Sequence, residues 1–66
     1  MSDVDALKAE LKKLSAKAIQ AKMDLHDLSE ELPINWESIP DVAETAFRAF
    51  AALEEKRAQL KRLEAA

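Results

Sequence analysis

His26 is the one histidine in this chain of 66 residues, and Glu30 follows it four positions later. Side chains four apart lie on one face of a helix, and at this spacing a histidine and a glutamate can supply two ligands to a divalent transition metal. Two ligands are half of a site, and a symmetric dimer would supply the rest by bringing both copies of His26 to one ion. The simpler interpretation is a surface histidine beside a carboxylate. Met23 fits packing better than ligation.

No combination of side chains in the sequence is typical of catalysis. Cysteine is absent, which excludes disulfides and thiolate chemistry, and glycine is absent, which excludes a phosphate-binding glycine loop. Ser15, Ser29 and Ser38 have no second histidine to activate them and are expected at helix surfaces and caps. We therefore expect no enzyme and no cofactor, apart from the metal considered at His26.

Two heptad patterns predict two long amphipathic helices. Apolar residues recur at alternating spacings of three and four, which is the pattern of a coiled-coil seam, and Lys56 is the one charged member. The first seam comprises Val4, Leu7, Leu11, Leu14, Ala18, Ala21, Leu25, Leu28 and Leu32, and the second comprises Ile39, Val42, Ala46, Ala49, Leu53, Lys56, Leu60 and Leu63.

Prolines mark where these helices end and begin. Pro33 ends the first helix, because the residue before a proline disfavours the helical conformation. Ser38, Pro40 and Asp41 have the order of a cap, an early proline and a capping acid at the start of the second. The connection is long enough only for an antiparallel return. The sequence predicts one all-α domain over 1–66, an antiparallel two-helix hairpin with helices at about 3–32 and 39–64 and a loop at about 33–38.

The helices carry more apolar surface than one hairpin can cover. Ile19, Met23, Phe47 and Phe50 recur at helical spacing outside the seam. A contiguous apolar patch of this kind indicates an interface, and so short a chain has little core of its own. We predict a homodimer, locally a four-helix bundle, with these four residues at its interface. The alternative is that the two phenylalanines fold over an alanine-lined groove within one chain.

Acidic and basic residues are distributed unevenly along the predicted rod. No lysine or arginine lies between Met23 and Phe47, where seven acidic residues lie. Asp27, Glu30 and Glu31 face the negative end of the first helix, which costs about 0.3–1 kcal/mol each. A local rule broken without compensation suggests a function. The alternative is a solvated acidic end that keeps the protein soluble.

The acidic end of the rod also carries the one tryptophan, Trp36, in the loop. A large aromatic side chain inside a charged rim has the composition of a protein docking site. In the alternative, Trp36 covers the open end of the core against Leu32 and Ile39. The predicted partner-binding residues are Met23, His26, Asp27, Glu30, Glu31 and Trp36.

Composition narrows the class of partner and the location. A formal net charge of −3 gives no electrostatic basis for binding nucleic acid or an anionic membrane. The N-terminus has no signal-peptide pattern, and no apolar run approaches the roughly 20 residues that span a bilayer. We expect a cytoplasmic protein that binds neither nucleic acid nor membrane.

The segment KMDLHDLSEELP at 22–33, followed by Trp36, Ile39-Pro40 and Ala43, resembles the Rop-like family of small helical hairpins encoded in nitrogen-fixation gene clusters. The resemblance is dense from 22 to 40 and generic outside that range. It implies a dimer of hairpins that supports nitrogenase, by contact with a nitrogenase component or its assembly machinery. It also implies contact of His26 with a divalent metal. The family name refers to shape, and RNA binding is not carried over.

Three functions remain open on these grounds. The first is an accessory or interaction protein of nitrogen fixation that binds through the acidic loop and the KMDLHDL face. The second is a small metal-binding protein in which His26 is assisted by Glu30 or Asp27. The third, a nucleic-acid-binding hairpin dimer, is disfavoured by the negative charge of the chain.

Overall fold

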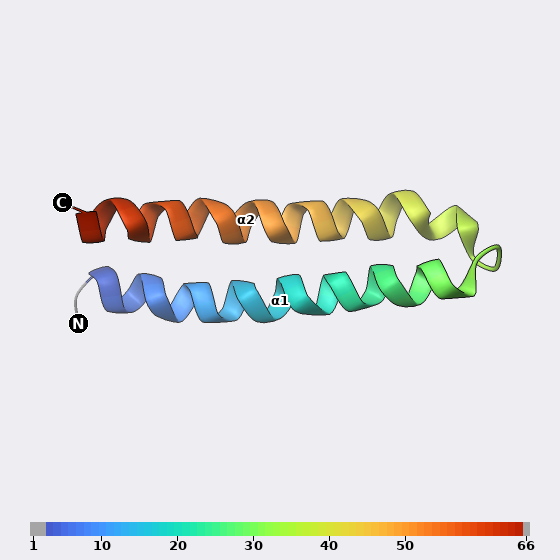
Figure 1. Ribbon diagram of the computed structural model, residues 1–66, viewed down its shortest axis with the longest axis horizontal. Coiled ribbons are helices and arrows are strands. Elements are labelled where there is room, and N and C mark those ends of the chain that lie inside the picture. Colours follow the sequence, from blue (N-terminus) through green and yellow to red (C-terminus); the bar gives the residue numbers. More distant parts are fainter. Residues whose placement is uncertain (1–2, 66) are drawn as a thin grey trace.

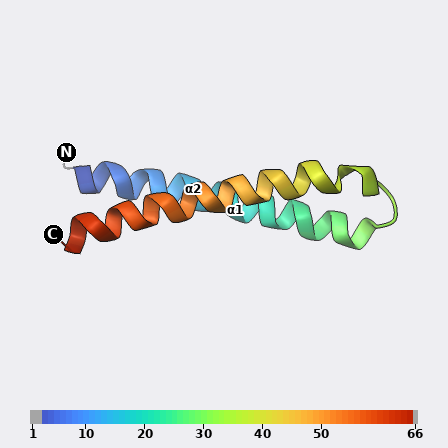
Figure 2. The ribbon, with the colours of Figure 1, turned by 90° about the horizontal axis from the view of Figure 1, so that it is seen from above.

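Two long helices lie side by side and antiparallel in the computed structural model, which describes residues 3–65 (Figure 1). Helix α1 spans Asp3–Glu31 and helix α2 spans Ile39–Ala65, with a short 3-10 helix, η1, at Trp36–Ser38 between them. The molecule is a rod of 49 × 15 × 13 Å, and its helices cross when seen from above (Figure 2). The predicted all-α antiparallel hairpin is confirmed.

The observed helix ends differ from the predicted ones by a single residue. Helix α1 ends at Glu31, one residue earlier than predicted, because Leu32 precedes Pro33 and lies in the turn. The backbone amide of Leu32 still donates to the carbonyl of Leu28 at 3.2 Å. Helix α2 continues one residue beyond the predicted end, to Ala65. Residues 1, 2 and 66 of the predicted domain lie outside the described residues.

The predicted seam supplies every buried residue of the part of the chain that the structure describes. Three of these six residues are alanines, and Ala18 is only 1% exposed. Small side chains in a seam allow two helices to approach closely without voids. The buried set is Leu7, Ala18, Ala21, Leu28, Ala46 and Leu53.

The charged seam position at Lys56 is satisfied by an ion pair between the helices. Its side chain is half-buried, and its Nζ lies 3.2 Å from Oε2 of Glu10 on α1. Toward the loop the seam opens, and Leu25, Leu32 and Ile39 are each about 40% exposed. Within residues 3–65, neither helix has an apolar stretch long enough to cross a membrane.

Asn35 reverses the chain between the helices. Its backbone is left-handed, with φ 61° and ψ 26°, a conformation that asparagine tolerates better than most residues. Its side-chain Nδ2 donates to Oε2 of Glu31 at 3.3 Å, and its carbonyl accepts from the amide of Ser38 at 2.9 Å. The amide of Ile34 donates to the Glu31 carbonyl at 3.0 Å. These bonds hold the loop as one ordered turn.

We predict that Asn35→Ala lowers the free energy of unfolding by about 1–2 kcal/mol, because alanine pays the full steric cost of the left-handed conformation. Asn35→Gly should cost less, since glycine adopts that conformation freely. Urea denaturation of both variants at one fixed protein concentration measures the difference. Equal losses would show that the side-chain bond to Glu31, and not the backbone conformation, is what asparagine contributes here.

Candidate functional site

The loop end of the rod presents apolar side chains to solvent. Trp36 is 62% exposed and Ile34 is 67% exposed. The ring of Trp36 therefore does not close the core against Leu32 and Ile39, which was the alternative to a docking role. Ile34 was not among the predicted partner-binding residues. Its position in the predicted loop at 33–38, where it has no seam to join, is the signal that could have identified it.

Acidic side chains surround this apolar loop end. The last turn of α1 contains no basic residue, as the sequence predicted. Glu30, Glu31, Glu37 and Asp41 are all exposed. Glu31 is partly compensated by the hydrogen bond that it accepts from Asn35. The arrangement is an aromatic and aliphatic cluster with a negatively charged rim.

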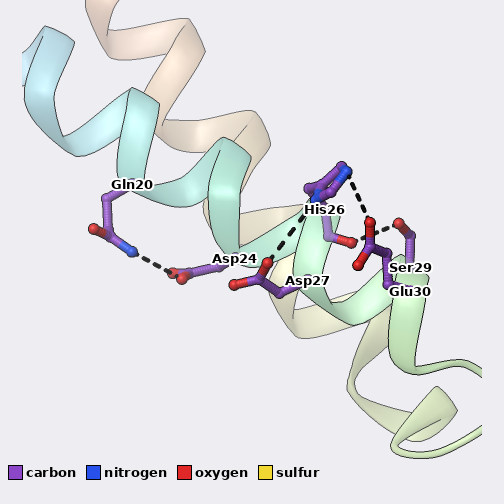
Figure 3. A network of polar contacts seen from close by, with 6 residues as sticks. All are labelled: Gln20, Asp24, His26, Asp27, Ser29 and Glu30. Carbon is purple, nitrogen blue, oxygen red and sulfur yellow. Dashed lines mark hydrogen bonds and ion pairs between the residues drawn. The ribbon is translucent and has the colours of Figure 1, made fainter.

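His26 lies between two acidic side chains on the exposed surface of α1 (Figure 3). Its Nε2 lies 3.3 Å from Oε1 of Glu30, and its Nδ1 lies 3.9 Å from Oδ1 of Asp27. The hydroxyl of Ser29 donates to the carbonyl of His26 at 2.6 Å. About two-thirds of each of the His26 and Glu30 side chains is exposed, so this contact adds about 1 kcal/mol or less to stability. The spacing thus places imidazole and carboxylate together, as expected.

One chain offers no complete metal centre within residues 3–65. No group of three or more His, Cys, Asp or Glu side chains in this range is arranged to hold an ion. His26 and Glu30 together supply two donors. A site built on this pair would need further donors from water or from a second chain.

A groove runs between the helices along one side of the hairpin. We call this the grooved side, and its lining comes from both helices. Lys17, Asp24 and Thr45 each directly precede a seam residue. Gln20 donates to Asp24 across one turn at 3.0 Å (Figure 3). The lining comprises Lys17, Gln20, Ala21, Asp24, Asp41, Val42, Thr45 and Ala49.

The opposite side of the hairpin carries larger apolar side chains in its middle. Residues that directly follow a seam position lie on the other side of the helix from those that precede it, since each residue turns the helix by about 100°. Ile19 and Phe47 follow Ala18 and Ala46 in this way, and Phe50 lies one turn beyond. We define the apolar side by Ile19, Phe47 and Phe50 together with Met23, which lies one turn beyond Ile19 on the outward part of α1.

All four residues of the apolar side are exposed in the single chain. Ile19 and Met23 are each more than half exposed, Phe47 is 75% exposed and Phe50 is 40% exposed. Phe47 therefore does not fold over the alanine groove within one chain, whereas more than half of Phe50 is covered there, so the alternative to an interface stays open for Phe50. The single hairpin leaves most of Phe47 and a smaller part of Phe50 in contact with water.

The total surface of the chain is large for its mass. Its accessible surface is 5310 Å², whereas a compact monomer of this mass would expose about 4200 Å². The excess of about 1100 Å² exceeds the roughly 800 Å² that each partner buries in a standard protein interface. The excess follows from the elongated shape of an isolated pair of helices.

Comparisons with known proteins place this hairpin among relatives. A family model described as Rop-like matches residues 2–65. A UPF0437 protein of Azorhizobium caulinodans is 60% identical over 65 residues, which cover 98% of this chain and 94% of the relative. A UPF0437 protein of Frankia alni, described as lying in the nifX-nifW intergenic region, is 47% identical over 51 residues, covering 77% of this chain and 62% of the relative.

The fold also matches a solved structure. An NMR structure of a Northeast Structural Genomics Consortium target has a TM-score of 0.90 and 46% identity, and the match covers 98% of this chain and 92% of that one. The similarity thus extends well beyond the segment at 22–40 on which the resemblance rested. On this evidence the chain belongs to the Rop-like family of helical-hairpin proteins.

Proposed function

We propose that the protein is a cytoplasmic, homodimeric and non-catalytic accessory protein of nitrogen fixation, which docks its loop end onto a nitrogenase component or the assembly machinery of nitrogenase. The genomic position described for the Frankia alni relative, between nifX and nifW, supports this setting. The observation that carries the docking proposal is the exposure of Trp36 and Ile34 inside an acidic rim.

The loop end has the physical properties of an anchor. A tryptophan buries a large area when a partner covers it, at a small cost in side-chain entropy. The short loop is already held by hydrogen bonds at Asn35, so it loses little conformational entropy when a partner binds. The acidic rim would favour a partner surface with lysine or arginine around an apolar pocket and would accelerate the encounter. The KMDLHDL face, with Met23 and His26, continues this surface along α1.

We predict that Trp36→Ala weakens capture of the nitrogenase partner by at least tenfold, since central tryptophans contribute about 2 kcal/mol or more at interfaces. Biolayer interferometry against purified nitrogenase components measures the change. Leu63→Ala is the matched control, because Leu63 is also an exposed apolar residue but lies at the opposite end of the rod. A variant Trp36→Ala that melts at a lower temperature and still binds its partner would remove the loop end as the docking site.

The acidic rim has its own expected effect. Glu30→Lys with Glu31→Lys should slow association and reduce its dependence on salt, because the steering charge is reversed. Glu54→Lys with Glu55→Lys makes the same change in charge just past the middle of α2, away from the loop, and should leave association nearly unchanged. Equal slowing by the two pairs would mean that net charge alone, and not the rim, governs the encounter.

The apolar side is proposed as the interface of the homodimer. We predict that Phe47→Asp with Phe50→Asp gives the mass of one chain in light scattering coupled to size exclusion, whereas the native protein gives twice that mass at micromolar concentration. Thermal stability should fall as well, since folding and association are linked. Gln20→Asp with Thr45→Asp adds the same charge to the grooved side and should remain dimeric. A native monomer would contradict the proposal.

A metal-binding role is the second candidate, favoured by the 3.3 Å approach of His26 Nε2 to Glu30 Oε1. A second chain would supply the remaining donors, so we expect one divalent ion for two chains. Calorimetric titration with Zn²⁺ should show binding that His26→Ala removes and that weakens at lower pH, because protons compete for the imidazole. His26→Ala with unchanged affinity would assign the ion to the acidic loop end instead.

A further inference from the structure

The groove on the grooved side has an apolar floor. It contains two adjoining hollows of about 160 and 250 Å³, which share Ala21, Asp24 and Thr45 in their lining, and most of the lining surface is apolar. Ala21 and Ala49 are seam residues with small side chains, so they leave the space between the helices unfilled on this side. Each hollow is smaller than the roughly 300–1,000 Å³ of a small-molecule site. The groove is therefore suited to side chains of another protein.

Carboxylates stand along both edges of the groove toward the loop. Asp24 lines it from α1, and Asp41 lines it from the first turn of α2. Asp27 and Glu31 also directly precede seam residues, which places them on the same side, farther toward the loop. All four are exposed. The hydrogen bond that Gln20 donates to Asp24 leaves the charge of that carboxylate in place.

The acidic part of the groove is about three helical turns long. It runs along α1 from Ala21 to Glu31, a separation of ten positions or about 15 Å. Farther from the loop the charge changes sign, since Lys17 lines the groove there and Arg48 directly precedes the seam residue Ala49. A positively charged occupant would therefore be held near the loop and not along the whole rod.

The occupant must satisfy its own backbone hydrogen bonds. Backbone groups within α1 and α2 are paired inside each helix, so an extended segment could not add to them as it does to the edge of a sheet. A helix has its backbone bonds already made, and a stripe of apolar residues along one face fits a groove between two rods. The small residues of the floor allow a third helix to approach closely, as they do within the hairpin.

We infer that the grooved side, over the three turns nearest the loop, binds an amphipathic helix of the partner protein whose apolar stripe is flanked by lysine or arginine. The apolar floor receives the stripe, and the carboxylates at the two edges face the flanking cations. The inference rests on the proposed docking function and names the chemistry of the partner segment. It adds Asp24 and Asp41 to the predicted partner-binding residues.

The two sides of the hairpin then have different occupants. The apolar side is proposed as the interface of the homodimer, which leaves the grooved side of each chain free to bind the helix. The KMDLHDL segment is divided between them. Asp24 and Asp27 lie on the grooved side, whereas His26 directly follows the seam residue Leu25 and lies on the opposite side. Metal binding at His26 and helix binding in the groove are therefore separable by mutation.

A peptide titration followed by NMR tests the inference on the full chain. The probe is a synthetic peptide of about 18 residues, long enough to form a helix, with leucine and alanine on one face and lysine on both flanks. A second probe has glutamate in place of each lysine. The amide signals of Ala21, Val42 and Thr45 should shift with the lysine peptide and respond weakly to the glutamate peptide. Shifts centred on Ile19 and Phe47, or equal affinity for the two peptides, overturn the inference.

The carboxylates at the edges have a matched control. Asp24→Asn with Asp41→Asn should raise the dissociation constant of the lysine peptide by about fivefold or more, because the charges that face its lysines are removed. Glu44→Gln with Glu54→Gln removes the same charge from positions of α2 that do not precede a seam residue, and should change the constant by less than about twofold. Equal effects of the two pairs would mean that net charge alone attracts the peptide, which overturns the inference.

Thr45→Phe tests the groove without a change in charge. Thr45 is exposed, so the larger side chain lies over the floor of the groove and leaves the seam intact. Binding of the lysine peptide should weaken by about fivefold or more, since the apolar stripe no longer reaches the floor. Ala51→Phe places the same ring on an exposed residue of α2 outside the lining and should leave binding unchanged. An unchanged dissociation constant in Thr45→Phe overturns the inference.

The same variants separate this inference from the proposed docking function. If Asp24→Asn with Asp41→Asn captures purified nitrogenase components as well as the native protein does, and Trp36→Ala does not, the loop end docks without the groove and the inference is wrong. A native protein that binds the lysine peptide and captures no nitrogenase component would refute the docking function and keep the groove as a helix-binding surface. Assembly of the native protein beyond the mass of two chains would assign the groove to a further copy of this chain and overturn the inference.

Discussion

The close approach of α1 and α2 through alanine determines the rest of this structure. Ala18, Ala21 and Ala46 are buried in the seam, where larger side chains would hold the helices apart. Small residues bring the backbones together but remove little apolar area from water. The larger apolar side chains of the middle of the rod, Ile19, Met23, Phe47 and Phe50, are left outside the seam. A thin core and an exposed second apolar surface are thus consequences of the same choice of residues.

Much of this arrangement can be predicted from the sequence, because the seam repeats at three and four with little interruption. The positions of the buried residues follow from that period, and the proline positions place the helix ends to within one residue. Lys56 is the instructive exception. The period identifies it as a charged residue in the seam, but its partner Glu10 lies on the other helix. Such a contact depends on the length and direction of two flexible side chains, which periodicity does not contain.

The loop could be predicted only in outline. Its length requires an antiparallel return, but the sequence does not show that Asn35 takes the left-handed conformation or that Ile34 faces solvent. The exposure of Trp36 was equally open, because a ring of that size can either close the core or project from it. Loop conformation depends on a few specific hydrogen bonds, here those between Asn35 and its neighbours, and no repeating pattern reports them.

The position of Trp36 has a practical consequence. The chain has one tryptophan and no tyrosine, so its intrinsic ultraviolet emission comes almost entirely from a single indole ring. That ring is 62% exposed at one end of a rod 49 Å long. The emission spectrum, and its quenching by acrylamide or iodide, therefore report the environment of the loop. They are nearly insensitive to changes in the environment of the helices. Trp36 is therefore an intrinsic fluorescent reporter of the loop. A molecule that covers the loop will change the emission of Trp36, and no label needs to be attached.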